Sequence, residues 1–241
     1  MSAVGTLPLV LVDDVFKIYR EGDVETVALR GASMTVERGE FVAIVGRSGS
    51  GKSTLLNIIG GLAEPTAGRV VVGGVDVARA DEDDRASIRR KMVGVVFQND
   101  NLIPFLTAEE NVSLPMQMAG RTGANKRARQ LLDELGVGTR RGHRPEQLSG
   151  GEKQRIAIAA ALANEPELLL ADELTGELDT ANTDSVMDEL GRLNESGTTL
   201  IVVTHNPRVA ERAHRVLHIT DGRIEESEAV HVRNTRTNGN A

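Results

Sequence analysis

The chain has 241 residues, a formal net charge of −7 and no cysteine, and aromatic residues make up only 2% of it. This length can bury the core of one large domain, with or without a sub-domain, and the lack of cysteine excludes disulfides, thiolate metal sites and a cysteine nucleophile. An acidic chain with so few aromatic rings lacks the basic surface and stacking platforms of nucleic-acid-binding proteins, so we expect no nucleic-acid partner.

The N-terminal part of the chain predicts strands. The first residues, MSAVGTLPLVLVDD, have no basic leader before their short apolar stretch, so we interpret them as the approach to a strand and not as a signal peptide. The segments Val10 to Lys17 and Val27 to Val36 alternate partly between apolar and polar residues, which predicts an antiparallel side sheet. No apolar run reaches the length of a membrane span. We therefore expect a soluble, cytoplasmic protein.

The segment GRSGSGKS is the first motif with a chemical meaning. It fits the pattern G-x-x-x-x-G-K-[ST], follows the apolar run Phe41 to Val45 and leads into a helical pattern from Ser53 to Leu62. Its glycines let successive main-chain N–H groups form an anion-binding hollow, where Lys52 reaches the terminal phosphates of a nucleotide and Ser53 ligates Mg²⁺. An ordinary glycine-rich turn is the alternative, but the strand and helix on either side favour the phosphate loop. The residues expected to hold the nucleotide here are Gly46, Arg47, Ser48, Gly49, Ser50, Gly51, Lys52, Ser53 and Thr54.

Four short apolar runs each end in a residue suited to phosphate or metal chemistry. Such runs are typical of strands buried on both faces of a parallel sheet, and ligands bind beyond the carboxyl ends of these strands. Helical patterns at Thr180 to Leu193 and Pro207 to His214 complete an α/β arrangement. The runs are Phe41 to Val45 before Gly46, Val93 to Phe97 before Gln98, Leu168 to Ala171 before Asp172 and Glu173, and Leu200 to Val203 before Thr204 and His205.

Between Thr107 and Asn164 the pattern changes to helices separated by proline and glycine, which predicts an inserted helical sub-domain. Within it, LSGGE places Ser149 and the amides of Gly150 and Gly151 at the start of a helix, where an anion can bind. Plain capping of that helix by Ser149 is a compatible alternative. The tail from residue 227 onward is polar and is expected to be disordered.

Taken in order, GRSGSGKS, Gln98, LSGGE, LLLADE, GELD and His205 resemble the nucleotide-binding subunit of ABC transporters over residues 8–226. The stretches VVFQNDNLIPFLTAEENVSLP and GKSTLLNIIGGLAEPTAG are most similar to the branch of lipoprotein-releasing, macrolide-exporting and cell-division ATPases. The resemblance implies a P-loop NTPase core with a mainly parallel sheet, an N-terminal antiparallel side sheet and a helical sub-domain at about 107–164. It also implies ATP and Mg²⁺ as cofactors, ATP hydrolysis, a head-to-tail homodimer and an integral membrane permease that holds the protein at the inner face of the membrane.

The resemblance assigns roles that the chemistry of each residue supports. Asp172 holds Mg²⁺, and Glu173 orients or deprotonates the attacking water; a solvated acidic loop is the alternative. Gln98 ligates Mg²⁺ or its water and senses the γ-phosphate. His205 hydrogen-bonds the γ-phosphate, although a lone histidine is more often structural. Tyr19, the only tyrosine, stacks on adenine, with a half-buried strand residue as the competing interpretation.

In the family, the turn at Ser149, Gly150 and Gly151 contacts the γ-phosphate held by the opposite subunit, so two chains complete two sites. Two residues depart from the family pattern: Leu174 stands where proline is usual, and Ala160 stands where arginine is common. Neither change removes a reacting group, so ATPase activity is still expected.

The resemblance leaves the transported substrate and the direction of transport open. One alternative function is an ATPase that regulates a permease-like partner without transport, and another is a non-transport ABC ATPase acting on DNA or ribosomes. The irregular segment after Gln98 is expected to receive a helix of the membrane subunit, and packing of its apolar residues inside the protein is the alternative. These residues are Leu102, Ile103, Phe105 and Leu106, around Pro104.

Overall fold

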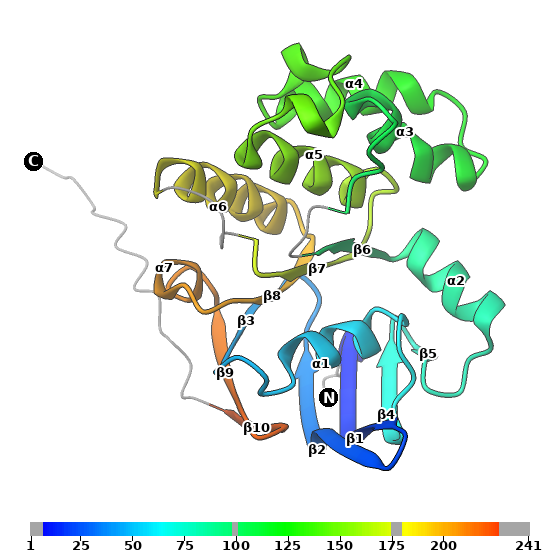
Figure 1. The fold of residues 1–241 in the computed structure, drawn as a ribbon, viewed down its shortest axis with the longest axis vertical. Coiled ribbons are helices and arrows are strands. Elements are labelled where there is room, and N and C mark those ends of the chain that lie inside the picture. Colours follow the sequence, from blue (N-terminus) through cyan, green and yellow to red (C-terminus); the bar gives the residue numbers. More distant parts are fainter. Residues whose placement is uncertain (1–6, 98–100, 175–179, 227–241) are drawn as a thin grey trace, which may run out of the picture.

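The computed structural model describes residues 7–97, 101–174 and 180–226. The predictions for Gln98 and for the tail from residue 227 concern residues outside these ranges. A six-stranded sheet in the order β10-β9-β3-β8-β7-β6 forms the centre of the molecule (Figure 1). Its strands are β3 Phe41–Val45, β6 Val93–Val96, β7 Leu168–Asp172, β8 Thr199–Val203, β9 Arg215–Thr220 and β10 Arg223–Glu226.

The strands β6, β7, β8, β3 and β9 are parallel neighbours, and β10 returns antiparallel to β9. Asp172 is in register with Val203, and Val96 with Ala171. The four predicted apolar runs therefore lie side by side as β3, β6, β7 and β8, and their carboxyl ends meet at one edge of the sheet.

Both faces of the central sheet are covered, which explains why β3, β6, β7 and β8 are apolar almost throughout. Phe41 and Ala43 pack into one hydrophobic core with the helices, whereas Val42 and Ile44 pack into a second core with the side sheet. Successive residues thus alternate between two cores and not between core and water.

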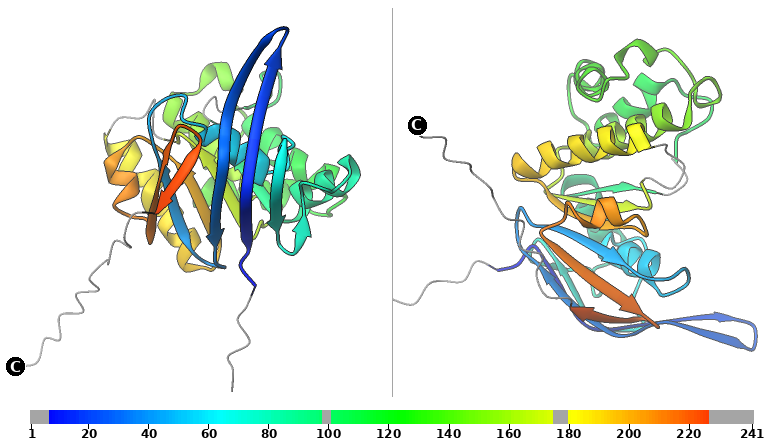
Figure 2. Two further views of the ribbon diagram at one scale, coloured as in Figure 1. Left: turned by 90° about the horizontal axis from the view of Figure 1, so that it is seen from below. Right: turned by 90° about the vertical axis from the view of Figure 1, so that its left-hand side faces the viewer.

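The second core lies under a four-stranded antiparallel sheet in the order β2-β1-β4-β5, with β1 Val10–Glu21, β2 Val24–Val36, β4 Ala67–Val72 and β5 Val75–Asp76. Helix α1, Lys52–Ile59, packs four apolar side chains into the same core. The β1–β2 hairpin is longer than predicted and projects beyond the rest of the sheet (Figure 2). The predicted end of α1 at Leu62 was wrong, because Gly60 and Gly61, the latter at φ +64°, end the helix earlier.

The charged stretch after β5 forms helix α2, Glu82–Lys91. Asp81 caps it by accepting a 2.8 Å hydrogen bond from the main-chain N–H of Asp84. The first turn is acidic and the last turn is basic, which matches the helix dipole at both ends. The order of acidic and basic residues along this segment therefore stabilises it as a helix.

Helices α3 Ala108–Met118, α4 Ala124–Glu134 and α5 Gly150–Leu162 pack together above the central sheet (Figure 1). Short 3₁₀ turns at Gly138–Arg140 and Pro145–Gln147 connect α4 to α5. Thr107 starts α3 with a capping box formed with Glu110, which fixes where the helical part begins.

Helix α6, Thr180–Glu195, leads to β8, and α7, Pro207–Ala210, leads to β9. The pattern predicted a helix as far as His214, but α7 is much shorter. The main-chain N–H of His214 donates to the carbonyl of Phe41, so the chain must leave the helix in time to pair with β3. None of the helices in the described ranges combines the length and the apolar character needed to cross a bilayer.

Candidate nucleotide-binding site

A cavity of about 350 Å³ lies where the carboxyl edge of the central sheet meets β2. The loop between β3 and α1 forms its floor, and the residues after β7 and β8 close one side. Residues from four separate parts of the chain therefore converge on one hollow. They are Thr26, Val27, Ala28, Gly46, Ser48, Gly49, Gly51, Lys52, Ser53, Thr54, Glu173 and His205.

Close packing around the β3–α1 loop requires glycine at two positions. A Cβ atom at Gly46 would lie 2.4 Å from the carbonyl oxygen of Ile219, and one at Gly51, which has φ +104°, would lie 2.4 Å from that of Ala28. The loop is thus clamped between β9 and β2, with its polar groups turned to the cavity. Arg47 and Ser50 support the loop from outside the cavity lining: the Arg47 carbonyl accepts from Lys52, and the Ser50 carbonyl accepts from Gly222.

The start of α1 is built for an anion. Gly51 caps the helix without any side-chain hydrogen bond, and the first turn holds no acidic residue, in contrast to the capped and acidic first turn of α2. The main-chain N–H groups of this turn and the helix dipole are therefore available to a phosphate. The Lys52 ammonium donates to the carbonyls of Gly46 and Arg47 at 3.0 and 2.9 Å, which holds it over the loop.

Asp172, at the end of β7, has the environment of a cation ligand. The side chain is 9% exposed, and its Oδ1 atom is buried without a hydrogen-bond partner. Burial raises the pKa of the Asp172 carboxyl, with the charge of Glu173 adding to the effect and a hydrogen bond from Ser53 opposing it. A hydroxyl and an unsatisfied carboxylate oxygen side by side are the hard oxygen donors that Mg²⁺ prefers, so the residues present fit this ion.

Glu173 and His205 face the same cavity from neighbouring strand ends. The His205 Nδ1 atom lies 2.5 Å from Oε2 of Glu173, and the Glu173 side chain is 16% exposed. The main-chain N–H of Glu173 also donates to the carbonyl of Val203. The structure thus brings together the two residues predicted to be catalytic, beside the phosphate loop.

Tyr19 does not line the cavity, but it pairs across the hairpin with Thr26, which does. Tyr19 is 41% exposed, and its cross-strand pairing places it next to a residue of the cavity lining. Sequence reasoning missed the contribution of Thr26, Val27 and Ala28. The turn at Gly22, with φ +59°, fixes the register of the hairpin and is the signal that places residue 26 opposite residue 19.

Ser149, Gly150 and Gly151 are absent from the cavity lining. Ser149 caps α5 in a capping box with Glu152, so the plain capping role predicted for it is present. Arg140 holds the Glu152 carboxylate at 2.7 Å. Within one chain, then, the phosphate loop and the start of α5 occupy separate places.

A family profile described as ABC transporter matches residues 29–176. The chain is 48% identical over 221 residues to the macrolide export ATP-binding/permease protein MacB of Hyphomonas neptunium; the match covers 91% of this chain but only 34% of that relative's length. It is 50% identical over 214 residues to an uncharacterized ABC transporter ATP-binding protein of Thermotoga maritima, covering 88% of this chain and 92% of that one.

A solved dimeric structure of the ATP-binding cassette MJ0796, in a post-hydrolysis state with ADP and Pi, superposes with a TM-score of 0.87 at 43% identity, covering 91% of this chain and 98% of that chain. This likeness confirms the predicted fold class: a P-loop NTPase core with a mainly parallel sheet, an antiparallel side sheet and helices. It also confirms the family that the sequence motifs resemble.

Proposed function

The chain belongs to the ABC transporter family and is an ABC ATPase, and on that premise we propose that it is the nucleotide-binding subunit that energises a separate membrane permease. The observation that carries the proposal is the convergence of the uncapped start of α1, Lys52, Glu173 and His205 on one cavity. Asp172 lies behind this lining, buried and hydrogen-bonded to Ser53. Residues 8–226 form the ATPase domain in this proposal, with residues 107–164 as its helical sub-domain.

Each residue has a place in ATP hydrolysis. The α1 amides and Lys52 bind the phosphates, and Tyr19 stacks on adenine. Ser53 and Asp172 hold Mg²⁺, which supplies charge neutralisation at the phosphates when bound. Glu173 accepts a proton from the attacking water, and His205 both steadies the Glu173 carboxylate and reaches toward the γ-phosphate. Gln98, outside the described residues, is the remaining proposed ligand.

Dimerisation completes the site in this proposal. The start of α5 lies away from the cavity of its own chain, yet Ser149 and the amides of Gly150 and Gly151 offer a second phosphate-binding helix terminus. Two chains arranged head to tail place each such turn against the nucleotide of the other chain. ATP then draws the two chains together, and hydrolysis separates them. The dimeric state of the similar cassette supports the formation of a dimer.

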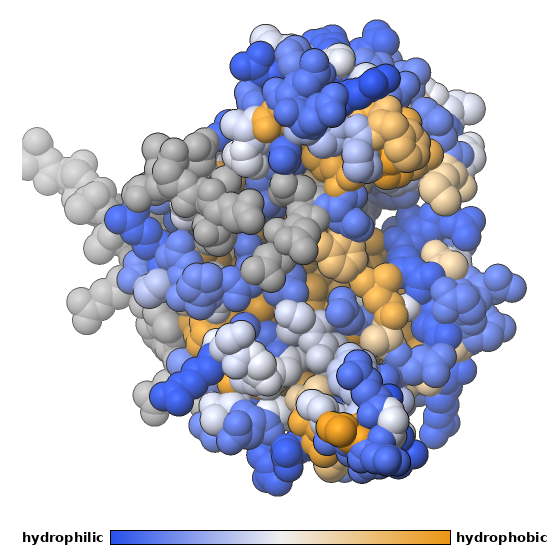
Figure 3. Space-filling model, in the orientation of Figure 1, coloured by the Kyte–Doolittle hydropathy of each residue, from blue (hydrophilic) through white to orange (hydrophobic). Residues whose placement is uncertain are grey.

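The membrane partner is proposed to dock in a hollow of about 330 Å³ between the helical part and β6, lined in part by Leu102, Ile103 and Met118. Hydrophobic surface gathers in this central hollow (Figure 3). Phe105, two residues after Ile103 in the chain, is 71% exposed, and Met118 is 73% exposed. Asn111 fixes the segment through hydrogen bonds of its side-chain amide. Its oxygen accepts from the main-chain N–H of Ile103, and its nitrogen donates to the carbonyls of Ile103 and Leu106. Leu102, Ile103 and Leu106 are half-buried, and Leu102 packs against the helical core, as in the alternative of internal packing. The exposed Phe105 ring on this segment fits the apolar face of an amphipathic permease helix.

The test is isolation of the tagged chain with its partner from detergent-solubilised membranes, followed by reconstitution of the pair in liposomes. Recovery of a permease that stimulates ATP hydrolysis and moves a substrate across the bilayer supports the transport function. Stimulated hydrolysis without movement of any offered substrate favours the alternative of permease-like regulation. A chain that binds no membrane protein and turns over ATP only with DNA or ribosomes would contradict the proposal. The names of the similar MacB proteins make an exporter the first candidate to examine.

A further inference from the structure

Lys17 lies directly against the ring of Tyr19. The two residues are two positions apart on β1, and the strand has a register irregularity between Lys17 and Ile18. The Lys17 ammonium lies over the Tyr19 ring, 4.9 Å from its centroid. This separation is within the range of a cation–π interaction. One face of the only tyrosine in the chain is therefore occupied by a cation.

The Lys17 ammonium also has a hydrogen-bond partner away from the ring. It donates a 2.7 Å hydrogen bond to the carbonyl of Glu64, in the loop between α1 and β4. That loop is itself fixed to β1, because the Thr66 N–H donates to the Phe16 carbonyl at 2.8 Å and the Thr66 hydroxyl accepts from the Ile18 N–H at 3.0 Å. Lys17 is thus tethered between the ring and a loop that cannot move independently of the strand.

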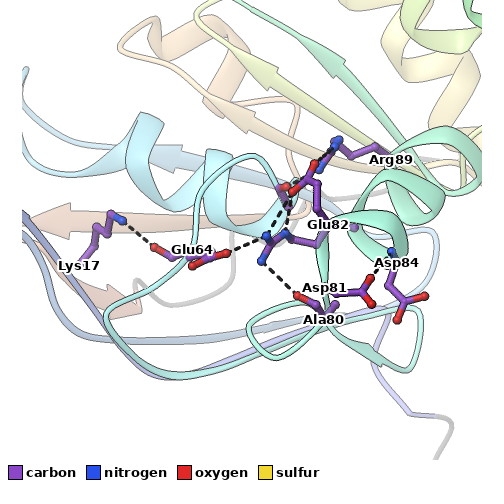
Figure 4. A network of polar contacts seen from close by, with 9 residues as sticks. Lys17, Glu64, Ala80, Asp81, Glu82, Asp84 and Arg89 are labelled. Atoms are coloured by element: carbon purple, nitrogen blue, oxygen red, sulfur yellow. Dashed lines mark hydrogen bonds and ion pairs between the residues drawn. The ribbon is translucent and has the colours of Figure 1, made fainter.

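The tether continues into a charge network in which the carboxylates are exposed and the Arg85 side chain is mostly covered (Figure 4). The Glu64 carboxylate lies 2.7 Å from the guanidinium of Arg85, whose side chain is only 12% exposed. Arg85 also bonds the Ala80 carbonyl and the Glu82 carboxylate, and Arg89 pairs with Glu82 at 2.6 Å. Helix α2 therefore fixes the loop that anchors Lys17.

We propose that Lys17 is a positioning residue for the nucleotide base: clamped by the Glu64 carbonyl, it covers one face of Tyr19 and presents the other face to adenine. The inference deepens the proposed function and rests on the stacking of adenine on Tyr19. It assigns Lys17 no contact with the nucleotide. Its effect passes through the ring.

Two physical effects favour base binding. A ring already held at one orientation loses less side-chain freedom when the base stacks on it. A cation on the far face also draws electron density from the ring, which reduces the repulsion between two stacked π faces. Because exposed cation–π contacts contribute modestly, loss of the ammonium should weaken nucleotide binding by about two- to fivefold.

The ring itself provides the first measurement. With a single tyrosine and no tryptophan or cysteine, the tyrosine band in near-ultraviolet circular dichroism of the full chain comes from Tyr19 alone. In the nucleotide-free protein, Lys17→Met should reduce this band, and Lys17→Arg should retain it. Arg20→Met is the matched control, because Arg20 is the nearby cation on β1 that pairs with Glu25, and it should leave the band unchanged.

Calorimetric titration with Mg-ADP provides the second measurement. Lys17→Met should raise the dissociation constant by about two- to fivefold. Its turnover rate at saturating ATP should be unchanged. Lys17→Arg, which keeps a cation, should bind with the affinity of the native protein. In a Tyr19→Leu background, Lys17→Met should have no further effect. Lys17→Gln serves as a second charge-removing variant if Lys17→Met has a lowered melting temperature.

The outcomes distinguish a failure of adenine stacking on Tyr19 from a failure of the role of Lys17. Normal affinity in Tyr19→Ala refutes adenine stacking itself. Weak binding in Tyr19→Ala together with normal binding in both charge-removing Lys17 variants overturns the role of Lys17 alone. A Lys17→Met effect that persists in the Tyr19→Leu background also overturns it, because Lys17 then acts on the nucleotide directly.

Discussion

The Nδ1 atom of His205 lies 2.5 Å from Oε2 of Glu173. The contact joins the ends of two neighbouring strands, and the Glu173 main-chain N–H reinforces it by donating to Val203. Glu173 adopts φ +54°, a left-handed conformation that is uncommon outside glycine. The neighbouring strand and the histidine thus hold the carboxylate in an orientation that the local chain alone does not favour. This is the arrangement expected of a group that must meet a water molecule at a defined position.

Glu173→Gln should bind ATP with nearly the affinity of the native protein and hydrolyse it not at all, because the amide keeps the shape of the carboxylate but cannot accept the proton. With hydrolysis blocked, Mg-ATP should hold the protein as a dimer. Size-exclusion chromatography with and without Mg-ATP measures this. Glu211→Gln, at an exposed position after α7, is the control and should hydrolyse ATP normally. A monomeric Glu173→Gln protein that still turns over ATP would remove Glu173 from the proposed role.

Tyr19→Ala should weaken nucleotide binding about tenfold, since one base-stacking contact contributes about 1.4 kcal/mol. Tyr19→Phe should bind almost normally, because it keeps the ring. The quantity to compare is the dissociation constant of Mg-ADP. Equal losses in both variants would assign the effect to the tyrosine hydroxyl, against the stacking role.

Local patterns predicted the α/β arrangement and the strands β3, β6, β7 and β8, because these strands are buried on both faces and continuous apolar runs are then the expected signal. The P-loop NTPase core followed from the family resemblance. Local patterns also predicted the strand ends that carry Asp172, Glu173 and His205. The short strands β4 and β5, the hairpin of β9 and β10, and helix α2 were missed. Their residues are stabilised by long-range pairing or by charge order, such as the tether of Arg85 to Glu64, which local periodicity cannot reveal.

Positions in the site that depend on distant contacts were equally hidden. Ala28 becomes part of the cavity because Gly51 packs against its carbonyl, and nothing in the sequence around residue 28 indicates this. The predicted strand ends at Lys17, and the family resemblance gave Tyr19 a stacking role, with a half-buried strand residue as the alternative. Neither prediction indicates a contact between the two residues. Their contact emerges when the α1–β4 loop anchors the lysine.

Asp172→Asn should raise the melting temperature of the nucleotide-free protein at neutral pH. Burial raises the pKa of Asp172 in the folded state, so the folded protein binds its proton more tightly than the unfolded chain, and stability falls as pH rises through the folded pKa. Asparagine does not ionise. The advantage of the variant should be present at neutral pH and vanish near pH 4, about the ordinary pKa of an aspartate.

Thermal unfolding across this pH range, with and without Mg-ATP, checks the prediction. Mg-ATP should stabilise the native protein by mass action and stabilise Asp172→Asn much less, because the variant loses a proposed metal ligand. An Asp172→Asn protein that is less stable than the native one at neutral pH, without ligand, would show that the buried carboxylate is already compensated.

Leu174→Pro should destabilise the protein, although proline is usual at this position in the family. The stabilising effect of proline requires a compatible backbone, and here the preceding residue, Glu173, has φ +54°, whereas proline restricts its predecessor to extended conformations. The Leu174 side chain is also 2% exposed and belongs to the helical core, so its loss leaves a void. The expected cost is about 2 kcal/mol or more, measured by urea unfolding. Leu174→Met, which conserves volume, should cost less than about 1.5 kcal/mol. A Leu174→Pro protein as stable as the native one would show that the turn can adopt a backbone compatible with proline.

Phe105→Glu should separate the ATPase from its membrane partner. The ring is 71% exposed, and the segment that carries it is fixed by Asn111, so a charge at this point is solvated in the isolated subunit but desolvated against an apolar partner helix. Basal ATPase activity and melting temperature should therefore be unchanged, while stimulation by the reconstituted permease is lost. Val24→Glu, at the start of β2 and 66% exposed, is the matched control and should keep full stimulation. Normal stimulation of a folded Phe105→Glu protein places the coupling surface elsewhere, and a fall in its melting temperature shows that the ring packs within the subunit.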